Sequence, residues 1–209
     1  MNLNELLNTR YSIRNYSDKD IPIETINEIL EASILAPSGQ NKQPWQFHII
    51  RKEENISKLA QIIENKVNEL KNYVKEEHKE LFENYGKFFD FFRTANTLIF
   101  ISSKPYSGGL KHIFTEEYLE KMKHEIDTTH TQSVSAAIMI LLLKSTELGI
   151  GTCWNTNILV AKKEIEEFLK IRKSFNLECL ISLGYPENGF NAENLNKKRL
   201  SLKKVSIFD

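Results

Sequence analysis

Apolar residues recur at every third or fourth position in five parts of the chain, which is the spacing of amphipathic helices. These parts span residues 3–7, 23–36, 53–83, 132–147 and 161–171. The pattern of the third part weakens after Val74, and Gly86 offers a break beyond it. In the fourth part, apolar side chains cover most faces, so we expect that helix in the centre of the core or in an interface.

Three shorter runs either alternate between apolar and polar residues or are apolar throughout, as half-buried and fully buried strands are. They span residues 45–50, 97–103 and 178–185. A chain of 209 residues can bury one good-sized core, so we expect a single domain over residues 1–209. Residues 104–131 have mixed polarity and several turn residues, and we expect a partly helical excursion there.

Two prolines bracket a polar loop between the second helical part and the first strand. Pro37 fixes φ and lacks an N–H, so it stops the helix before it. Gly39 frees the backbone for positive φ and lets a ligand approach closely. Ser38, Asn41 and Gln43 supply short donors and acceptors for a flat group with polar edges. By themselves these residues fit a helix-to-strand connection as well as a binding loop.

Arg10, Ser12 and Arg14 stand at every second position near the N-terminus. In an extended backbone this spacing points all three side chains to one side. Two guanidinium groups around a hydroxyl suit a phosphate, because guanidinium binds phosphate oxygens bidentately and the hydroxyl donates one more hydrogen bond. Taken alone, the spacing also fits a surface patch of ion pairs.

Two further segments carry candidate binding residues. Gly149 stands where a glycine is favoured just past a helix C-terminus, and residues 151–156 are expected as a loop with exposed backbone N–H groups. The C-terminal residues 187–209 are expected as an arm in which Lys197 and Arg199 lie two apart. A solvated basic tail and a phosphate-binding pair both fit that spacing.

These segments together resemble the nitroreductase-like flavoproteins. Four motifs occur in order: Arg-x-Ser-x-Arg at 10–14, Ala-Pro-Ser-Gly-x-Asn-x-Gln-Pro-Trp at 36–45, Leu-Gly-x-Gly-Thr-Cys-Trp at 148–154, and a last strand at 180–186 followed by Lys-x-Arg at 197–199. The match spans nearly the whole chain. The resemblance implies an α+β fold with a central mixed or antiparallel sheet flanked by helices. It also implies a homodimer in which the C-terminal arms are domain-swapped.

The resemblance further implies FMN at each of two subunit junctions, with NADH or NADPH as the electron donor. The residues that it assigns to the cofactor are Arg10, Tyr11, Ser12, Arg14, Lys197 and Arg199 around the phosphate and ribityl chain, Pro37, Ser38, Gly39 and Asn41 reaching the partner's flavin, and Trp154, Asn155 and Thr156 beside the isoalloxazine. At Thr156-Asn157 the sequence departs from relatives that carry an acidic residue followed by glycine. The group that contacts flavin N5 is therefore left open.

Charge and cysteine content narrow the class of protein. The formal net charge is zero, so no global field favours nucleic acid or a membrane surface. The chain has only two cysteines, Cys153 and Cys179, which favours a reducing compartment over a disulfide framework. They do not form C-x-x-C, so no iron–sulfur or zinc cluster is expected. The start of the chain lacks the features of a signal peptide, and the apolar run at 136–143 is shorter than the roughly 20 residues that cross a bilayer. We expect a cytoplasmic protein without nucleic-acid or membrane partners.

The function implied by the resemblance is transfer of hydride from NAD(P)H through flavin N5 to an organic acceptor, by a ping-pong mechanism. Nitroaromatics, quinones and similar molecules are the implied acceptors. No catalytic acid, base or nucleophile and no metal ligand is singled out, since the cofactor carries the chemistry. Two alternatives stay open: another flavin redox role, such as dehalogenation, enoate reduction or flavin fragmentation, and a non-catalytic FMN-binding protein.

Overall fold

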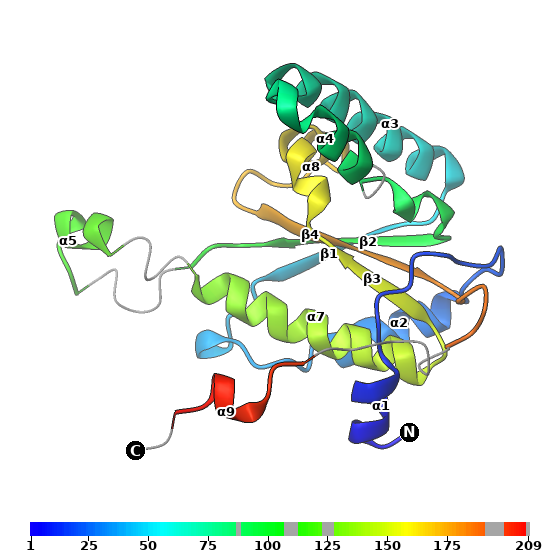
Figure 1. Ribbon diagram of the computed structural model, residues 1–209. Coiled ribbons are helices and arrows are strands. Elements are labelled where there is room, and N and C mark those ends of the chain that lie inside the picture. The colour runs from blue at the N-terminus through cyan, green and yellow to red at the C-terminus, as the bar shows by residue number, and fades with distance from the viewer. Residues whose placement is uncertain (87–88, 107–112, 123–127, 191–198, 208–209) are drawn as a thin grey trace.

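The structure is a computed structural model that describes residues 1–86, 89–106, 113–122, 128–190 and 199–207. A four-stranded antiparallel sheet stands at its centre (Figure 1). Its strands are β1 (Trp45–Ile50), β2 (Thr97–Ser103), β3 (Gly151–Asn155) and β4 (Asn176–Gly184), in the order β1-β2-β4-β3. The three strands expected from the sequence are confirmed, the first two with the expected bounds.

Helices cover both faces of the sheet (Figure 1). One face carries α3 (Glu53–Leu70), α4 (Lys79–Gly86) and α8 (Lys162–Phe168), and the other carries α2 (Ile23–Ser33) and α7 (Thr129–Glu147). The other helical elements among the described residues are α1 (Leu3–Thr9), α5 (Glu116–Lys121), α9 (Leu202–Val205) and the short 3-10 turns η1 (Gly39–Asn41), η2 (Lys71–Tyr73), η3 (Glu76–His78), η4 (Phe91–Thr94) and η6 (Asn157–Ala161). This arrangement confirms the expected α+β sheet flanked by helices.

Alternation along the central strand β2 explains the two layers. Leu98 and Phe100 belong to the apolar cluster under α3 and η6, whereas Ile99 and Ile101 belong to the cluster with α2 and α7. Successive side chains of a strand point to opposite faces, so an apolar run such as residues 97–103 requires a cover on both sides. Every residue of β2 is buried, as that requirement predicts.

The C-terminus of α7 fixes the start of the edge strand β3. Gly149 has φ of +75°, its N–H donates to the Thr146 carbonyl at 3.1 Å, and the Ile150 N–H donates to the Ser145 carbonyl at 2.8 Å. These two bonds form a Schellman motif, which needs a residue in the left-handed region and so favours glycine. The helix end expected at Leu148 and Gly149 is confirmed.

Several expectations from the sequence are wrong in detail. The third helix ends at Leu70 and gives way to short 3-10 turns before α4, instead of continuing to residue 83. Residues 151–155 form a strand that pairs with β4 and is mostly buried, instead of an exposed loop. The fifth helix is limited to Lys162–Phe168, because residues 157–161 adopt a 3-10 turn.

The two variable regions are described in part. Within the excursion at 104–131, α5 confirms partial helicity, whereas 107–112 and 123–127 lie outside the described residues. In the C-terminal arm, 191–198 and 208–209 lie outside them as well. Among the helices that the structure describes, none is both long and apolar enough to cross a membrane.

Candidate cofactor site

An extended N-terminal segment, residues 10–14, lies along the edge strand β3. Ser12 forms a parallel bridge with Thr152, and the Ile13 N–H donates to the Thr152 carbonyl at 2.9 Å. The side chain of Ile13 packs on the bare backbone of Gly151, where an added Cβ would lie 2.9 Å from its Cβ. This parallel bridge beside the antiparallel sheet is the local geometry that the every-second-residue spacing requires.

Arg10, Ser12 and Arg14 all influence the pKa of the Cys153 thiol. Burial raises the pKa of the Cys153 thiol, and the charge of Arg14, a hydrogen bond with Ser12 and the charge of Arg10 partly offset that effect. Cys153 is buried, so its thiol is part of the protein interior beside the arginine segment. The guanidinium of Arg14 also lies over the ring of Phe91, 5.5 Å from the ring centre, and this cation–π contact restrains the side chain.

Tyr11 has a separate setting. Its ring meets the ring of Phe190 edge to face, with the ring centres 6.1 Å apart. A small pocket of about 170 Å³ opens between residues 11–15 and residues 186–189. Its size suits a phosphate-sized group and not a whole dinucleotide, and it lies beside the segment that carries the two arginines.

The C-terminal end of β3 presents Trp154, Asn155 and Thr156. The Asn155 Oδ1 accepts a hydrogen bond from the Asn157 N–H at 2.7 Å, so the residue makes a turn with its own backbone. The Asn155 Nδ2 is buried and has no hydrogen-bond partner among the described residues. Trp154 is 39% exposed and Thr156 is exposed, so this end of the strand is open at the surface.

Asn155 and Cys153 share one face of β3, because they are two residues apart. Residues 10–14 and the buried Asn155 amide thus both border the edge strand β3, and we refer to residues 10–14, Cys153 and Asn155 together as the strip along β3. An unpartnered buried amide is costly unless a ligand or water completes it.

The loop with Pro37, Ser38, Gly39 and Asn41 lies elsewhere, against the N-terminal half of α7 (Figure 1). The Gly39 N–H donates to the Ser133 Oγ at 3.4 Å, and the Ser38 Oγ accepts from the Gln43 N–H at 3.0 Å. In one chain the loop and the arginine segment are thus not brought together.

The loop's backbone is unusual in a different way from the one expected. Positive φ is found at Gln40, Asn41 and Gln43, with values of 54°, 54° and 45°, and not at Gly39. What Gly39 provides is space, since an added Cβ would lie 2.6 Å from the Tyr106 hydroxyl. Pro37 and Asn41 are exposed.

The basic pair of the C-terminal arm is seen in part. Arg199 is exposed and precedes α9, whereas Lys197 lies outside the described residues. The assignment of this pair to the phosphate stays a prediction.

Some residues that position the arginine segment and the loop were not singled out from the sequence. Gly151 receives Ile13, and Tyr106 and Ser133 hold the loop through a hydrogen bond of 3.1 Å between their hydroxyls. The Gly-x-Gly pattern at 149–151 was a usable signal for the first. No local pattern marks Tyr106, because its contact depends on tertiary packing.

A family comparison agrees with this geometry. The model described as "Nitroreductase family" matches residues 7–185, which include the arginine segment, the loop and β3. The chain belongs to the nitroreductase family. The family and the fold support a flavoprotein oxidoreductase, and they confirm the resemblance found in the four sequence motifs.

Relatives within and around the nitroreductase family differ in their named activities. Iodotyrosine deiodinase 1 of Rattus norvegicus is 27% identical over 208 residues, covering 97% of this chain and 68% of its own. A protein of Archaeoglobus fulgidus with the provisional name NADH dehydrogenase/NAD(P)H nitroreductase is 28% identical over 187 residues, covering 88% and 85%.

Solved structures confirm the nitroreductase-like fold. A BluB-like flavoprotein of Clostridium difficile 630 is 28% identical and has a TM-score of 0.86, covering 100% of this chain and 99% of its own. An iodotyrosine deiodinase bound to FMN and 3-iodo-L-tyrosine has a TM-score of 0.69 at 23% identity, covering 96% and 98%. The latter likeness shows the fold alone.

Proposed function

We propose that the protein is an FMN-dependent oxidoreductase that uses NADH or NADPH to reduce an organic acceptor, such as a nitroaromatic or a quinone. The observation that carries the proposal is the strip along β3, in which Ser12 of the arginine segment pairs with Thr152 and the buried amide of Asn155 has no hydrogen-bond partner among the described residues. Family membership supports the flavin, and the name of the Archaeoglobus relative supports the nicotinamide donor.

The donor set fits the phosphate of FMN. Arg10 and Arg14 supply fork-shaped cations, and Ser12 supplies a hydroxyl, which together match a phosphate dianion with several oxygens. Phe91 behind Arg14 and β3 beside Ser12 limit the movement of these groups, so less side-chain entropy is lost on binding. In this proposal Lys197 and Arg199 add further positive charge from the arm.

The other end of the strip fits a flat heterocycle. The Asn155 Nδ2 is a buried donor that needs an acceptor, and the exposed Thr156 follows it at the end of the strand. The exposed ring of Trp154 is on the opposite face of β3. Isoalloxazine presents carbonyl and ring-nitrogen acceptors along one edge, so it can complete that amide. This is the test on which the cofactor assignment rests.

Bound FMN supplies hydride acceptance and donation at N5. The residues of this chain would bind and orient it: Arg10 and Arg14 would hold the phosphate, and Asn155 would hold the edge of the ring. The buried, neutral thiol of Cys153 would exclude water from the strip. No side chain is assigned a proton-transfer step.

A homodimer is part of the proposal. The loop with Pro37, Ser38, Gly39 and Asn41 lies away from the arginines of its own chain, so it would serve the flavin of a second copy. On α7, Ala136, Met139, Ile140 and Leu143 are half-buried apolar residues, a composition that suits an interface.

Reductive dehalogenation is the second candidate function. It is supported by the deiodinase relative, which aligns with 97% of this chain. Steady-state oxidation of NADH and NADPH by the FMN-loaded protein, with 4-nitrobenzoate, 1,4-benzoquinone and 3-iodotyrosine as acceptors, separates the two. Turnover with the first two acceptors supports the proposal. Iodide release in the absence of nitro or quinone turnover would replace it with the second candidate.

A further inference from the structure

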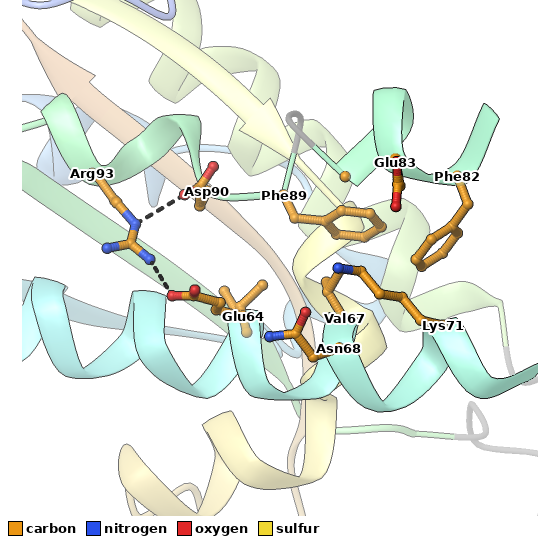
Figure 2. Close-up of a pocket in the computed structure, with 11 residues that line it drawn as sticks. Glu64, Val67, Asn68, Lys71, Phe82, Glu83, Phe89, Asp90 and Arg93 are labelled. Atoms are coloured by element: carbon orange, nitrogen blue, oxygen red, sulfur yellow. Dashed lines mark hydrogen bonds and ion pairs between the residues drawn. The ribbon is translucent and has the colours of Figure 1, made fainter. Parts of the chain in front are cut away.

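A cavity of about 500 Å³ lies between α3 and α4, outside the strip along β3 (Figure 2). Its wall on the α3 side includes Ile63, Val67 and Lys71, which are four residues apart and therefore lie on one face of the helical segment. Phe82 and Glu83 of α4 and Phe89 form the opposite wall. The volume is within the range of sites that hold small organic molecules.

The inner part of the cavity is apolar and aromatic. Ile63 and Phe89 are buried, and Val67 and Phe82 are half-buried. Figure 2 shows the rings of Phe82 and Phe89 along the same wall, facing the α3 side. Such a lining favours the burial of a hydrocarbon or aromatic body.

One end of the cavity is lined by a half-exposed ion cluster. The guanidinium of Arg93 contacts Glu64 at 3.0 Å and Asp90 at 3.0 Å (Figure 2). Two carboxylates therefore already occupy the donors that Arg93 directs to this side. Arg93 therefore lines the cavity, but its charge is already paired and does not bind an anionic ligand.

Lys71 is different, because its amine extends over the cavity towards Phe89 (Figure 2). It makes no ion pair with any residue that the structure describes. Lys66, on the same helix, points elsewhere and is paired with Glu69 at 2.9 Å and Glu164 at 3.3 Å. The cavity thus combines an apolar interior with the amine of Lys71, which has no carboxylate of the described residues within ion-pair distance, although the carboxylate of Glu83 lines the facing wall.

We propose that this cavity binds a monocarboxylate with an aromatic body. Lys71 holds the carboxylate, and Val67, Phe82 and Phe89 surround the ring. The carboxylate of Glu83 on the facing wall disfavours a second negative charge, so a dicarboxylate of similar size is rejected. The Asn68 amide, one turn before Lys71, supplies a further hydrogen-bond donor.

This proposal does not rest on the redox function, because none of the cavity residues belongs to the strip along β3. The cavity and the strip are nevertheless close together. Asp90 and Arg93 of the cavity flank Phe91 in sequence, and the ring of Phe91 contacts the guanidinium of Arg14. Binding is therefore measured on the purified protein with and without added FMN.

Isothermal titration with 3-phenylpropionate tests the proposal, with 3-phenylpropanamide and glutarate as comparison ligands. We expect saturable binding of one 3-phenylpropionate per chain, about fivefold weaker binding of the amide, and no binding of glutarate. Lys71→Met keeps the apolar stem and removes the charge, so the acid should lose its preference and bind no better than the amide. Lys58→Met, an exposed position of α3 outside the cavity, is the matched control and should keep the preference.

A second variant addresses the apolar part. Val67→Trp fills the cavity and should abolish binding of both the acid and the amide, with an unchanged circular dichroism spectrum as the check on folding. Absence of saturable binding to the unmodified protein would overturn the proposal. An acid-over-amide preference that survives in Lys71→Met would overturn it as well.

Discussion

The Cβ of Ile13 lies 2.9 Å from the point at which a side chain on Gly151 would begin. A Cβ cannot be accommodated at that distance, so Gly151→Ala should push the arginine segment away from β3. We expect a loss of about 1–3 kcal/mol in the free energy of unfolding, measured by urea denaturation. We also expect weaker FMN binding.

Gly86→Ala is the matched control for that substitution. A Cβ at Gly86 meets nothing within 4 Å, and the residue ends a helix. This variant should leave stability unchanged or raise it by up to about 1 kcal/mol. Equal effects of the two alanine substitutions would contradict the packing argument.

Arg14 should contribute to FMN affinity and not to folding. Loss of a charge-assisted, bidentate contact in Arg14→Ala should weaken FMN binding by about 10- to 100-fold, measured by quenching of flavin fluorescence. The double substitution Arg10→Ala with Arg199→Ala should release FMN on gel filtration. Lys52→Ala, an exposed residue before α3, should bind FMN as the unmodified protein does. Retention of flavin by the double variant would refute the phosphate assignment.

Tyr16 should give the protein a pH-dependent stability in the alkaline range. Burial raises the pKa of its hydroxyl above the ordinary value, although a hydrogen bond with Ser182 partly offsets the effect. In the unfolded chain the hydroxyl ionises near pH 10, so above that pH the folded state binds more protons than the unfolded state. Stability must then fall as pH rises above about 10.

Tyr16→Phe isolates this contribution. In the unmodified protein the Tyr16 hydroxyl lies 2.6 Å from the Ile13 carbonyl oxygen and 2.8 Å from the Ser182 Oγ. The variant loses both hydrogen bonds and should be about 1–2 kcal/mol less stable at pH 7. Its stability should fall less steeply above pH 10. Cys153 and Cys179 are present in both proteins. The difference between the unfolding free energies of the two proteins from pH 8 to 11, measured by chemical denaturation, therefore reports on Tyr16. Parallel pH curves would contradict the prediction.

Gln40 offers a test of the loop's backbone. Its φ of 54° lies in the left-handed region, which costs a residue with a side chain roughly 1–2 kcal/mol. Gln40→Gly should therefore raise the free energy of unfolding by up to about 1 kcal/mol. Lys42, two residues on, has φ of −72°, so Lys42→Gly should lower stability instead. The pair is compared by thermal unfolding, and the same sign for both would show that the strain is absent.

Elements with a strong local pattern could be predicted closely from the sequence. The alternating run at Trp45–Ile50 and the apolar run at Thr97–Ser103 have the bounds that the pattern gave. Residues 151–155 could not be recognised as a strand, because the segment is short, begins with glycine and ends with asparagine, and its strand character depends on pairing with β4. The break after Leu70 was missed since no glycine or proline marks it.

The candidate site shows the same division. The spacing of Arg10, Ser12 and Arg14 indicated an extended segment, and the structure confirms one, because Ser12 pairs with Thr152 of β3. That the segment lies on Gly151 depends on a long-range contact, which no local pattern contains. The positive φ at Gln40 and Asn41 was unexpected, because glycine is the residue that ordinarily adopts it and Gly39 stands next to them.

The visible spectrum of the FMN-loaded protein under anaerobic conditions, before and after addition of NADH or NADPH, tests the central claim most directly. The proposed function predicts flavin absorption that bleaches on addition of one or both nicotinamides and returns when an acceptor is added. A protein that refuses added FMN, or bound flavin that stays oxidised with both nicotinamides, would contradict it.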